Sequence, residues 1–157
     1  MALEFSPQAL RKVSEIVRRY PHKQSAVVPV LYLAQEEFGH LSQEAIEYVG
    51  KLMEIPAARL YGIVSFYTML NMKPVGRHHI QVCRTLPCAL QGAGSVISFL
   101  KERLAVNLGE TTPDGKFTLS AVECLASCGT APVMQINDAY YENLSPEKIE
   151  KILAFLK

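Results

Sequence analysis

The chain has 157 residues, a formal net charge of +1 and 49% hydrophobic residues, which suits one ordinary domain, or a small domain with a helical appendage, and provides for a core. The scattered charges exclude the basic stripe typical of nucleic-acid-binding proteins. No segment approaches the ~20 apolar residues of a membrane-spanning helix, and the N-terminus lacks a signal-peptide pattern, so we expect a cytoplasmic protein without direct membrane insertion.

The first part of the chain, residues 1–70, has the apolar spacing and the start and stop signals of helices. Ser6 and Ser42 each stand directly before an amphipathic segment, where a serine hydroxyl caps a helix. Gly39 is a typical C-terminal stop. We expect four helices. The first begins after Ser6, the second covers Ser25–Phe38, the third begins after Ser42 and the fourth follows Pro56. This region is therefore predicted to be a helical N-terminal module.

The remainder of the chain, residues 71–157, alternates between strand and helix patterns after a loop that contains Pro74 and Gly76. We expect strands at His78–Cys83, Phe117–Glu123, Pro132–Ile136 and Ala139–Glu142, a helix from about Leu90 to Leu104, a loop at Thr111–Gly115, and a last helix that opens at Ser145 and Pro146. The order strand, helix, loop, three strands and helix is consistent with a small α/β sandwich of thioredoxin-like type.

All four cysteines of the chain lie in this second part. Cys83 and Cys88 enclose four residues, and Cys124 and Cys128 enclose three. Each pair follows a predicted strand, and loops at strand ends can converge on a ligand because the strands beneath hold them in place. The four thiols are therefore the candidate ligands of a metal centre.

Four alternatives follow from the cysteines alone. Disulfides are neither favoured nor needed in a cytoplasmic chain with an adequate core, and a thioredoxin-type dithiol site requires a Cys-x-x-Cys spacing that neither pair has. Four thiolates can hold structural zinc or an iron–sulfur cluster. Zinc ribbons usually have two-residue gaps, whereas gaps of four and three give wider loops that surround a binuclear cluster. Spacing favours iron–sulfur and leaves zinc open.

The histidines and the small residues near the cysteines limit the types of metal centre that the chain can hold. A Rieske cluster needs two histidine ligands, but the chain has no Cys-x-His motif, and alternation along a strand places His78 and His79 on opposite faces, as ordinary strand residues. A 2Fe-2S cluster with four thiolates carries a charge of about −2, and about −3 after reduction, so it needs backbone dipoles at close range. The small residues that follow Cys88 and Cys128 permit such an approach. No Gly-x-Gly-x-x-Gly or P-loop motif predicts a nucleotide site.

Two long segments resemble a known family. They are SFYTMLNMKPVGRHHIQVC, which ends at Cys83, and GETTPDGKFTLSAVECLASCGTAPVMQINDAYYENLSPEKIEKIL, which contains Cys124 and Cys128. The chain is similar to the small thioredoxin-like 2Fe-2S subunit, known as the E-type subunit, of bacterial NADH:quinone oxidoreductase, which is respiratory complex I. The resemblance implies a mixed α+β or α/β protein, with an N-terminal helical bundle at residues 1–70 followed by a thioredoxin-like 2Fe-2S ferredoxin domain at residues 71–157.

The same resemblance implies a function and its residues. One 2Fe-2S cluster is expected on Cys83, Cys88, Cys124 and Cys128, with the first two on one iron and the last two on the other. The cluster is expected to take one electron from reduced FMN on a larger partner subunit that binds FMN and NADH, in the peripheral arm of the complex. The helical module is then a docking element. This chain alone is expected to catalyse no reaction and to bind no nucleic acid.

Two other functions remain open at this point. One is the equivalent diaphorase subunit of an NAD-linked hydrogenase or formate dehydrogenase, which shares the same module. The other, from a different class, is an interaction module stabilised by zinc. A departure from the family pattern lies between the first two ligands, where Pro87 cannot donate an N–H and Arg84 adds a positive charge that is expected to favour the reduced cluster.

Overall fold

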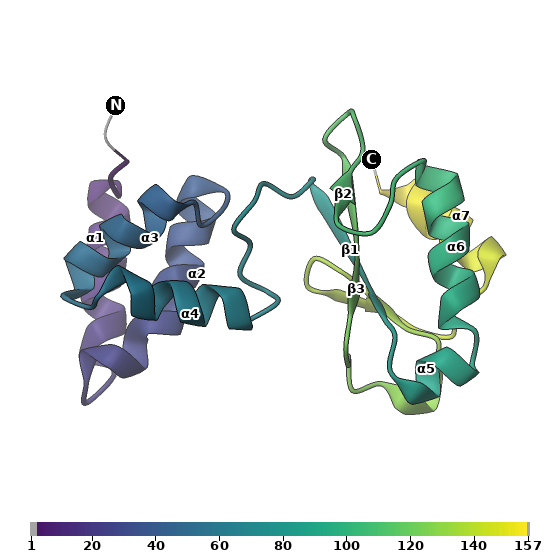
Figure 1. Ribbon diagram of the computed structural model, residues 1–157, viewed down its shortest axis with the longest axis horizontal. Coiled ribbons are helices and arrows are strands. Elements are labelled where there is room, and N and C mark those ends of the chain that lie inside the picture. The colour runs from purple at the N-terminus through teal and green to yellow at the C-terminus, as the bar shows by residue number, and fades with distance from the viewer. Residues whose placement is uncertain (1–2, 157) are drawn as a thin grey trace. The chain divides into compact units, whose positions relative to one another are not determined.

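The computed structural model describes residues 3–156, which form two compact units (Figure 1). The helical unit ends at Pro74, and the sheet unit begins at Val75. Within the described residues, no helix combines the length and the apolar character that crossing a membrane requires. The mixed helix-and-sheet fold class predicted from the sequence is confirmed.

The described residues of the helical unit form four α-helices, as predicted. They are α1 (Pro7–Arg18), α2 (Val27–Phe38), α3 (Gln43–Met53) and α4 (Ala57–Phe66). The predicted caps are present: the Oγ of Ser6 accepts a hydrogen bond from the backbone N of Ala9 at 3.2 Å, and the Oγ of Ser42 accepts from Ala45 at 3.1 Å. Each bond satisfies a backbone N–H that has no partner inside its helix.

The second helix begins two residues later than predicted. Residues Lys23–Ala26 form a short 3₁₀-helix, and α2 starts at Val27. Pro29 then falls in the first turn, where a missing N–H breaks no helical hydrogen bond. Gly39, with φ of +80°, ends the helix as expected.

An aromatic cluster joins three parts of the helical unit. The ring of Phe5 stacks on that of Phe38 with centroids 5.1 Å apart, and it meets the ring of Tyr48 edge to face at 5.4 Å. The Tyr48 hydroxyl also accepts a hydrogen bond from the backbone N of Phe5 at 3.1 Å. These contacts tie the segment before α1 to α2 and α3, and a core of buried aliphatic side chains fills the space between the helices.

The sheet unit is built on five strands in the order β2-β3-β1-β4-β5. They are β1 (His78–Cys83), β2 (Glu110–Thr111), β3 (Phe117–Val122), β4 (Met134–Ile136) and β5 (Ala139–Tyr141). β1 and β3 are parallel neighbours, and the other pairs are antiparallel. The short strand β2 has too few residues to show alternation and is absent from the sequence prediction.

Three helices accompany this sheet, namely α5 (Leu86–Leu90), α6 (Ala93–Leu104) and α7 (Pro146–Phe155). Figure 1 shows α6 and α7 on the same face of the sheet. Their inward side chains, among them Leu100 and Ile149, pack with Ile80 and Leu119 of the central strands. Because β1 and β3 are fixed by this core, the loops that leave their ends start from rigid positions.

The structure corrects several predicted boundaries. The helix expected from about Leu90 begins at Ala93, because Gly92, with φ of +93°, separates it from the five-residue helix α5. Glu123 lies outside β3, and Glu142 lies outside β5. Pro132 lies before β4, since proline cannot donate to the ladder of a central strand.

Gly76 fixes the entry into β1. A Cβ atom at this position would stand 2.9 Å from the carbonyl carbon of Phe117 and 3.0 Å from the carbonyl oxygen of Gly115, so no side chain fits. The backbone N of Gly76 donates to the Oγ1 of the buried Thr118 at 2.6 Å. This close contact sets the start of β1 against β3, and Cys83 stands at the other end of the same strand.

Candidate metal centre

The parallel pairing of β1 and β3 brings the first and third cysteines to one edge of the sheet. Cys83, the last residue of β1, is in register with Val122, the last residue of β3, and Cys124 follows two residues later. The backbone N of Arg84 donates to the carbonyl of Val122 at 3.0 Å. This is the last backbone hydrogen bond between the two strands before the segments that follow them separate. Both cysteine loops therefore start at the same end of adjacent strands.

The first cysteine pair is buried and in direct contact. Cys83 and Cys88 are each 2% exposed and pack with Ala93 and Val133. After Cys83 the chain turns into α5, which places Cys88 beside the end of β1, and the two thiols share a hydrogen bond. The structure thus brings together the two residues that the family resemblance assigns to one iron.

Hydrogen bonds at the Cys83 sulfur favour its thiolate. Burial raises the pKa of this thiol, but hydrogen bonds from the side chain and backbone of Thr85 and from the backbone of Leu125 lower it by more. The Thr85 hydroxyl oxygen lies 3.3 Å from the sulfur. The net pKa lies below its ordinary value. Donors of this kind are what a metal-bound thiolate requires, because they spread its negative charge over the peptide dipoles.

Cys88 responds to its neighbours in the opposite direction. Burial raises the pKa of its thiol, and the hydrogen bond with Cys83 raises it further. The backbone N–H of Val133 offsets part of this rise, whereas the charges of Cys83 and Cys128 add to it. A bound metal centre would compensate the negative charge of these thiolates.

The second cysteine pair lies on an exposed loop. The Sγ of Cys124 accepts a hydrogen bond from the backbone N of Ala126 at 3.3 Å, and Ala126 has the unusual φ of +57° that turns this N–H toward the sulfur. Cys128 opens a short 3₁₀-helix, Cys128–Thr130. Both thiols face solvent, in contrast to the buried first pair. A ligand held between the two pairs would be half enclosed.

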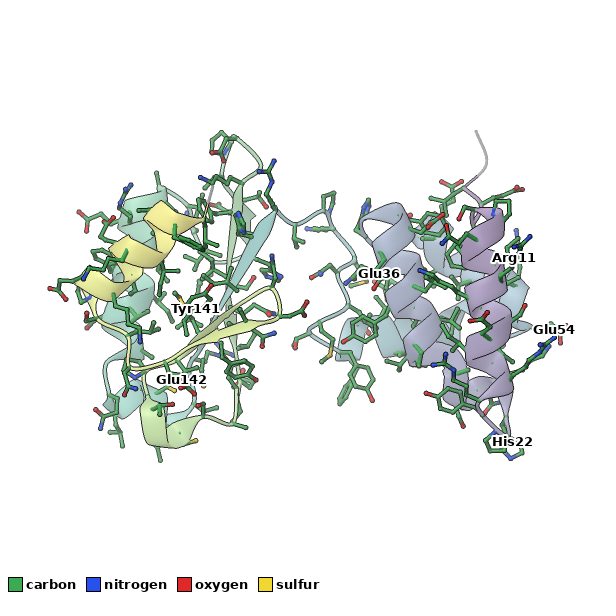
Figure 2. The ribbon with its side chains drawn as sticks, turned by 180° about the vertical axis from the view of Figure 1, so that it is seen from behind. Arg11, His22, Glu36, Glu54, Tyr141 and Glu142 are labelled. Atoms are coloured by element: carbon green, nitrogen blue, oxygen red, sulfur yellow. The ribbon has the colours of Figure 1, made fainter. Side chains whose placement is uncertain are left out.

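The side chain of Glu142, which directly follows β5, holds the second loop from one side. The Oγ of Ser127 lies 2.8 Å from the Oγ1 of Thr130, and it donates to the carboxylate of Glu142. These hydroxyl bonds lower the pKa of Glu142 below its ordinary value. Figure 2 shows Glu142 beside the short helix that Cys128 opens. The loop between Cys124 and Cys128 is therefore attached to Glu142, the residue that follows β5.

Arg84 does not carry an isolated charge. Its guanidinium forms an ion pair with the carboxylate of Glu123, with the Nε 3.0 Å from the Oε1. Glu123 directly precedes Cys124, so this pair joins the residue after Cys83 to the residue before Cys124. The sequence prediction for Arg84 did not include this partner. The two residues are 39 positions apart, and the sequence alone does not show that the sheet brings them together.

The donor set fits a binuclear cluster. The four cysteines are free thiols, arranged as one contacting pair and one adjacent loop pair. In the part of the chain that the structure describes, no three cysteine, histidine, aspartate or glutamate side chains gather closely enough to hold one metal ion. A 2Fe-2S cluster requires two pairs, one on each iron, whereas structural zinc requires four ligands around a single point. Four thiols, two in each of two loops, match the ligand set of the cluster.

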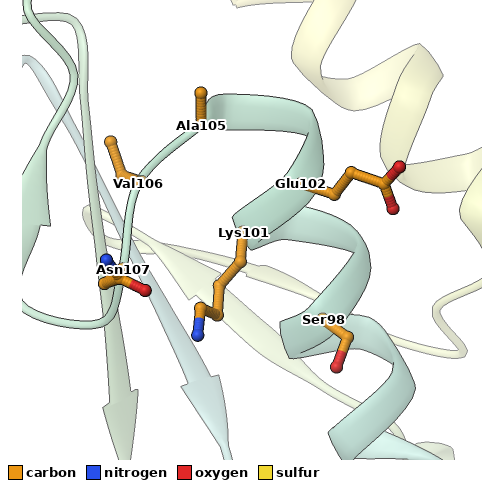
Figure 3. A pocket seen from close by; sticks show the side chains of 6 residues that line it. All are labelled: Ser98, Lys101, Glu102, Ala105, Val106 and Asn107. Carbon is orange, nitrogen blue, oxygen red and sulfur yellow. The ribbon is translucent and has the colours of Figure 1, made fainter.

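The paired histidines and the hollow beside α6 lie apart from the cysteines. His78 and His79 stand at the start of β1, and the ring of His79 lies 2.8 Å from the Oγ of Ser120 while burial lowers its pKa. The hollow, of about 390 Å³ at the C-terminal end of α6, is lined by Ser98, Lys101, Glu102, Ala105, Val106 and Asn107 (Figure 3). It contains no cysteine, so it does not contribute to the candidate centre.

The fold and the cysteine arrangement together define a small α/β ferredoxin. The chain matches the family model of the thioredoxin-like [2Fe-2S] ferredoxins over residues 13–157, and it belongs to this family. The predicted thioredoxin-like fold and 2Fe-2S cofactor are thereby confirmed. That these four cysteines are its ligands stays a prediction.

Two curated relatives give the resemblance its detail. The E-type subunit of the NADH-quinone oxidoreductase of Rickettsia bellii (strain RML369-C) is 47% identical over 156 residues, which are 98% of this chain and 93% of the relative. The second E-type subunit of the NADH-quinone oxidoreductase of Rhizobium meliloti (strain 1021) is 39% identical, over 90% of this chain and 84% of the relative. The resemblance to this type of subunit that the sequence motifs suggested is confirmed.

A solved structure supports the fold. The NAD+-reducing [NiFe]-hydrogenase in its air-oxidized state matches with a TM-score of 0.72 and 18% identity, over 83% of this chain and 22% of the hydrogenase chain. At this identity the likeness concerns the fold alone. The same architecture therefore occurs as a part of a longer chain in a different oxidoreductase.

Proposed function

We propose that this chain is the electron-transfer subunit of an NADH:quinone oxidoreductase and holds one 2Fe-2S cluster on Cys83, Cys88, Cys124 and Cys128. The observation that carries the proposal is that the parallel register of β1 and β3 brings Cys83 opposite Val122, two residues before Cys124, so that both cysteine loops leave the sheet at the same end. Family membership and the relatives from NADH-quinone oxidoreductases support the same function. Bound there, a 2Fe-2S cluster supplies one-electron redox chemistry.

The enclosure of the site suits a carrier rather than a catalyst. Cys83 and Cys88 lie against the core, which shields one side of the site from water. Cys124 and Cys128 face the surface, and the neighbouring helix α5 has an outer side on which Leu90 is 76% exposed. A partner that covers this side would bring its own redox group within a short distance of the sulfurs.

The partner that fits this chemistry is a larger subunit that carries FMN and binds NADH. A flavin accepts electrons in pairs from a hydride donor and passes them on singly to an iron–sulfur cluster. We assign the helical unit, residues 1–70 in the sequence prediction, to docking on that subunit. The proposed place of the assembly is the peripheral arm of the complex, because a subunit that oxidises NADH needs access to this water-soluble substrate.

Purification of the tagged full chain from its native cells tests this function. We expect a flavin-containing subunit to co-purify. In that assembly, NADH should reduce the 2Fe-2S cluster and produce its EPR signal, whereas it should not reduce the cluster of the isolated chain. Co-purification with hydrogenase or formate dehydrogenase subunits would instead assign the chain to a diaphorase, an alternative that the hydrogenase fold match keeps in view. An isolated zinc protein without iron would reject both.

A further inference from the structure

We propose that Arg84 and Glu123 are a positioning pair that holds the two cysteine loops together for cluster assembly and retention. The inference rests on the proposed cluster and concerns residues that are not ligands. The pair joins the residue after Cys83 to the residue before Cys124, and each loop contributes two of the four sulfurs.

The pair stands where the backbone ladder ends. β1 and β3 are bonded in register up to Cys83 and Val122, and the last backbone bond runs from Arg84 to Val122. Beyond this point the segment after β1 enters α5, and the segment after β3 enters the exposed loop. Sheet hydrogen bonds therefore no longer connect the two segments. The Arg84 guanidinium reaches Glu123 through its Nε and its Nη2, and this side-chain contact extends the connection by one residue.

The second loop needs this connection at its near end. Its far end is attached to Glu142 through Ser127, but Cys124 and Cys128 are exposed and contribute little to the core. Close to Cys124, the first loop also has two hydrogen bonds at Cys83, because the thiol donates to the Glu123 carbonyl at 3.5 Å and the backbone N–H of Leu125 donates to the sulfur. Cluster binding deprotonates this thiol and removes the first of these bonds, because a thiolate has no proton to donate. The Leu125 N–H and the ion pair then remain as polar connections between the loops, and the ion pair is the one formed by two side chains.

The size of the effect is modest, because the side chains of Arg84 and Glu123 are 59% and 71% exposed. An exposed ion pair shifts an equilibrium by a few-fold only, and here both guanidinium nitrogens donate to the same carboxylate oxygen. We therefore expect about a threefold faster loss of the cluster when either partner is removed. Arg103 and Glu150 form an ion pair of similar exposure between α6 and α7, 2.7 Å apart, and provide a matched control away from the cysteines.

The test measures cluster loss from the anaerobically purified full chain in the presence of an iron chelator, followed by visible absorbance. Arg84→Ala and Glu123→Gln should each lose the cluster about threefold faster than the natural chain, and the double variant no faster than either single one, because the two act through one contact. Arg84→Lys should lie in between. The charge-swapped chain, Arg84→Glu with Glu123→Arg, should regain part of the retention, and Arg103→Ala should behave like the natural chain.

Three results would overturn the inference: unchanged rates in both single variants, single effects that multiply in the double variant, or an equal effect of Arg103→Ala. The midpoint potential separates positioning from charge. The loss of positioning is measured as faster cluster release in both single variants. The loss of a charge is measured as a shift of the midpoint potential, which has opposite directions in Arg84→Ala and Glu123→Gln. Failure of the proposed function would be visible earlier, because the natural chain would then contain no iron.

Discussion

The ion pair beside the cysteines leads to a prediction about the potential of the cluster. Arg84→Ala leaves the Glu123 carboxylate unpaired next to Cys124, and Glu123→Gln leaves the Arg84 guanidinium unpaired. Reduction adds a negative charge to the cluster. An unpaired carboxylate therefore disfavours reduction and lowers the midpoint potential, whereas an unpaired guanidinium raises it. The double variant, which removes both charges, should return close to the natural value.

The magnitude follows from proximity and exposure. Adjacent residues are ~3.8 Å apart along the chain, so a carboxylate on the neighbour of a ligand lies on the order of 8 Å from the cluster. At that separation one unit charge is worth about 0.5 kcal/mol with the dielectric constant of water and about 1 kcal/mol at half that value. For one electron this corresponds to roughly 20–45 mV. Physiological salt should reduce the shift to less than about half.

The assay is a redox titration of the purified chain at low ionic strength, monitored by the EPR signal of the reduced cluster. Arg103→Ala, which removes an equally exposed arginine elsewhere in the sheet unit, should leave the potential unchanged. Shifts of the same sign in Arg84→Ala and Glu123→Gln, or no shift in either, would refute the electrostatic reasoning.

Three further predictions concern the support of the site. Thr118→Val removes the buried acceptor of the Gly76 N–H and should cost about 1–3 kcal/mol of the free energy of unfolding, and a calorimetric melting temperature equal to that of the natural chain would contradict this. Gly76→Ala forces a Cβ against the backbone of the adjacent strand and should cost a similar ~1–3 kcal/mol, measured by urea unfolding; unchanged stability would show that the strand entry can move. Ser127→Ala should raise the pKa of Glu142 toward its ordinary value in an NMR titration, because the hydroxyl hydrogen bond that lowers it is lost, and a constant pKa would rule out this contact. In the natural chain the same bond should stabilise the second loop above that pKa and weaken as the pH falls through it, since a protonated carboxyl accepts more weakly.

The sequence predicted the main elements of the fold because they depend on local signals. Ser6 and Ser42 are helix-capping residues that mark the starts of α1 and α3. The alternation of apolar and polar residues from Phe117 indicates a strand. The elements that were missed or misplaced depend on contacts distant in sequence. The two residues of β2 pair with β3 and carry no pattern of their own, and the break at Gly92 reflects a backbone turn between α5 and α6.

The candidate site shows the same division. Residue type and spacing single out the cysteines, and strands of predictable position carry the loops that hold them. The contribution of Glu123 depends on the parallel register of β1 and β3, which a single sequence does not reveal. The backbone donors to Cys83 also come from two loops that meet only in the folded chain. The supporting contacts of the site therefore required the structure, whereas its chemistry was predictable.

The central claim is that these four cysteines hold a 2Fe-2S cluster, and metal analysis combined with EPR tests it most directly. The full chain, purified without oxygen, should contain two irons and two acid-labile sulfides and give an EPR signal of one unpaired spin after one-electron reduction. Replacement of Cys83 by serine should abolish or strongly alter that signal. A colourless chain with one zinc ion and no EPR signal would contradict the account.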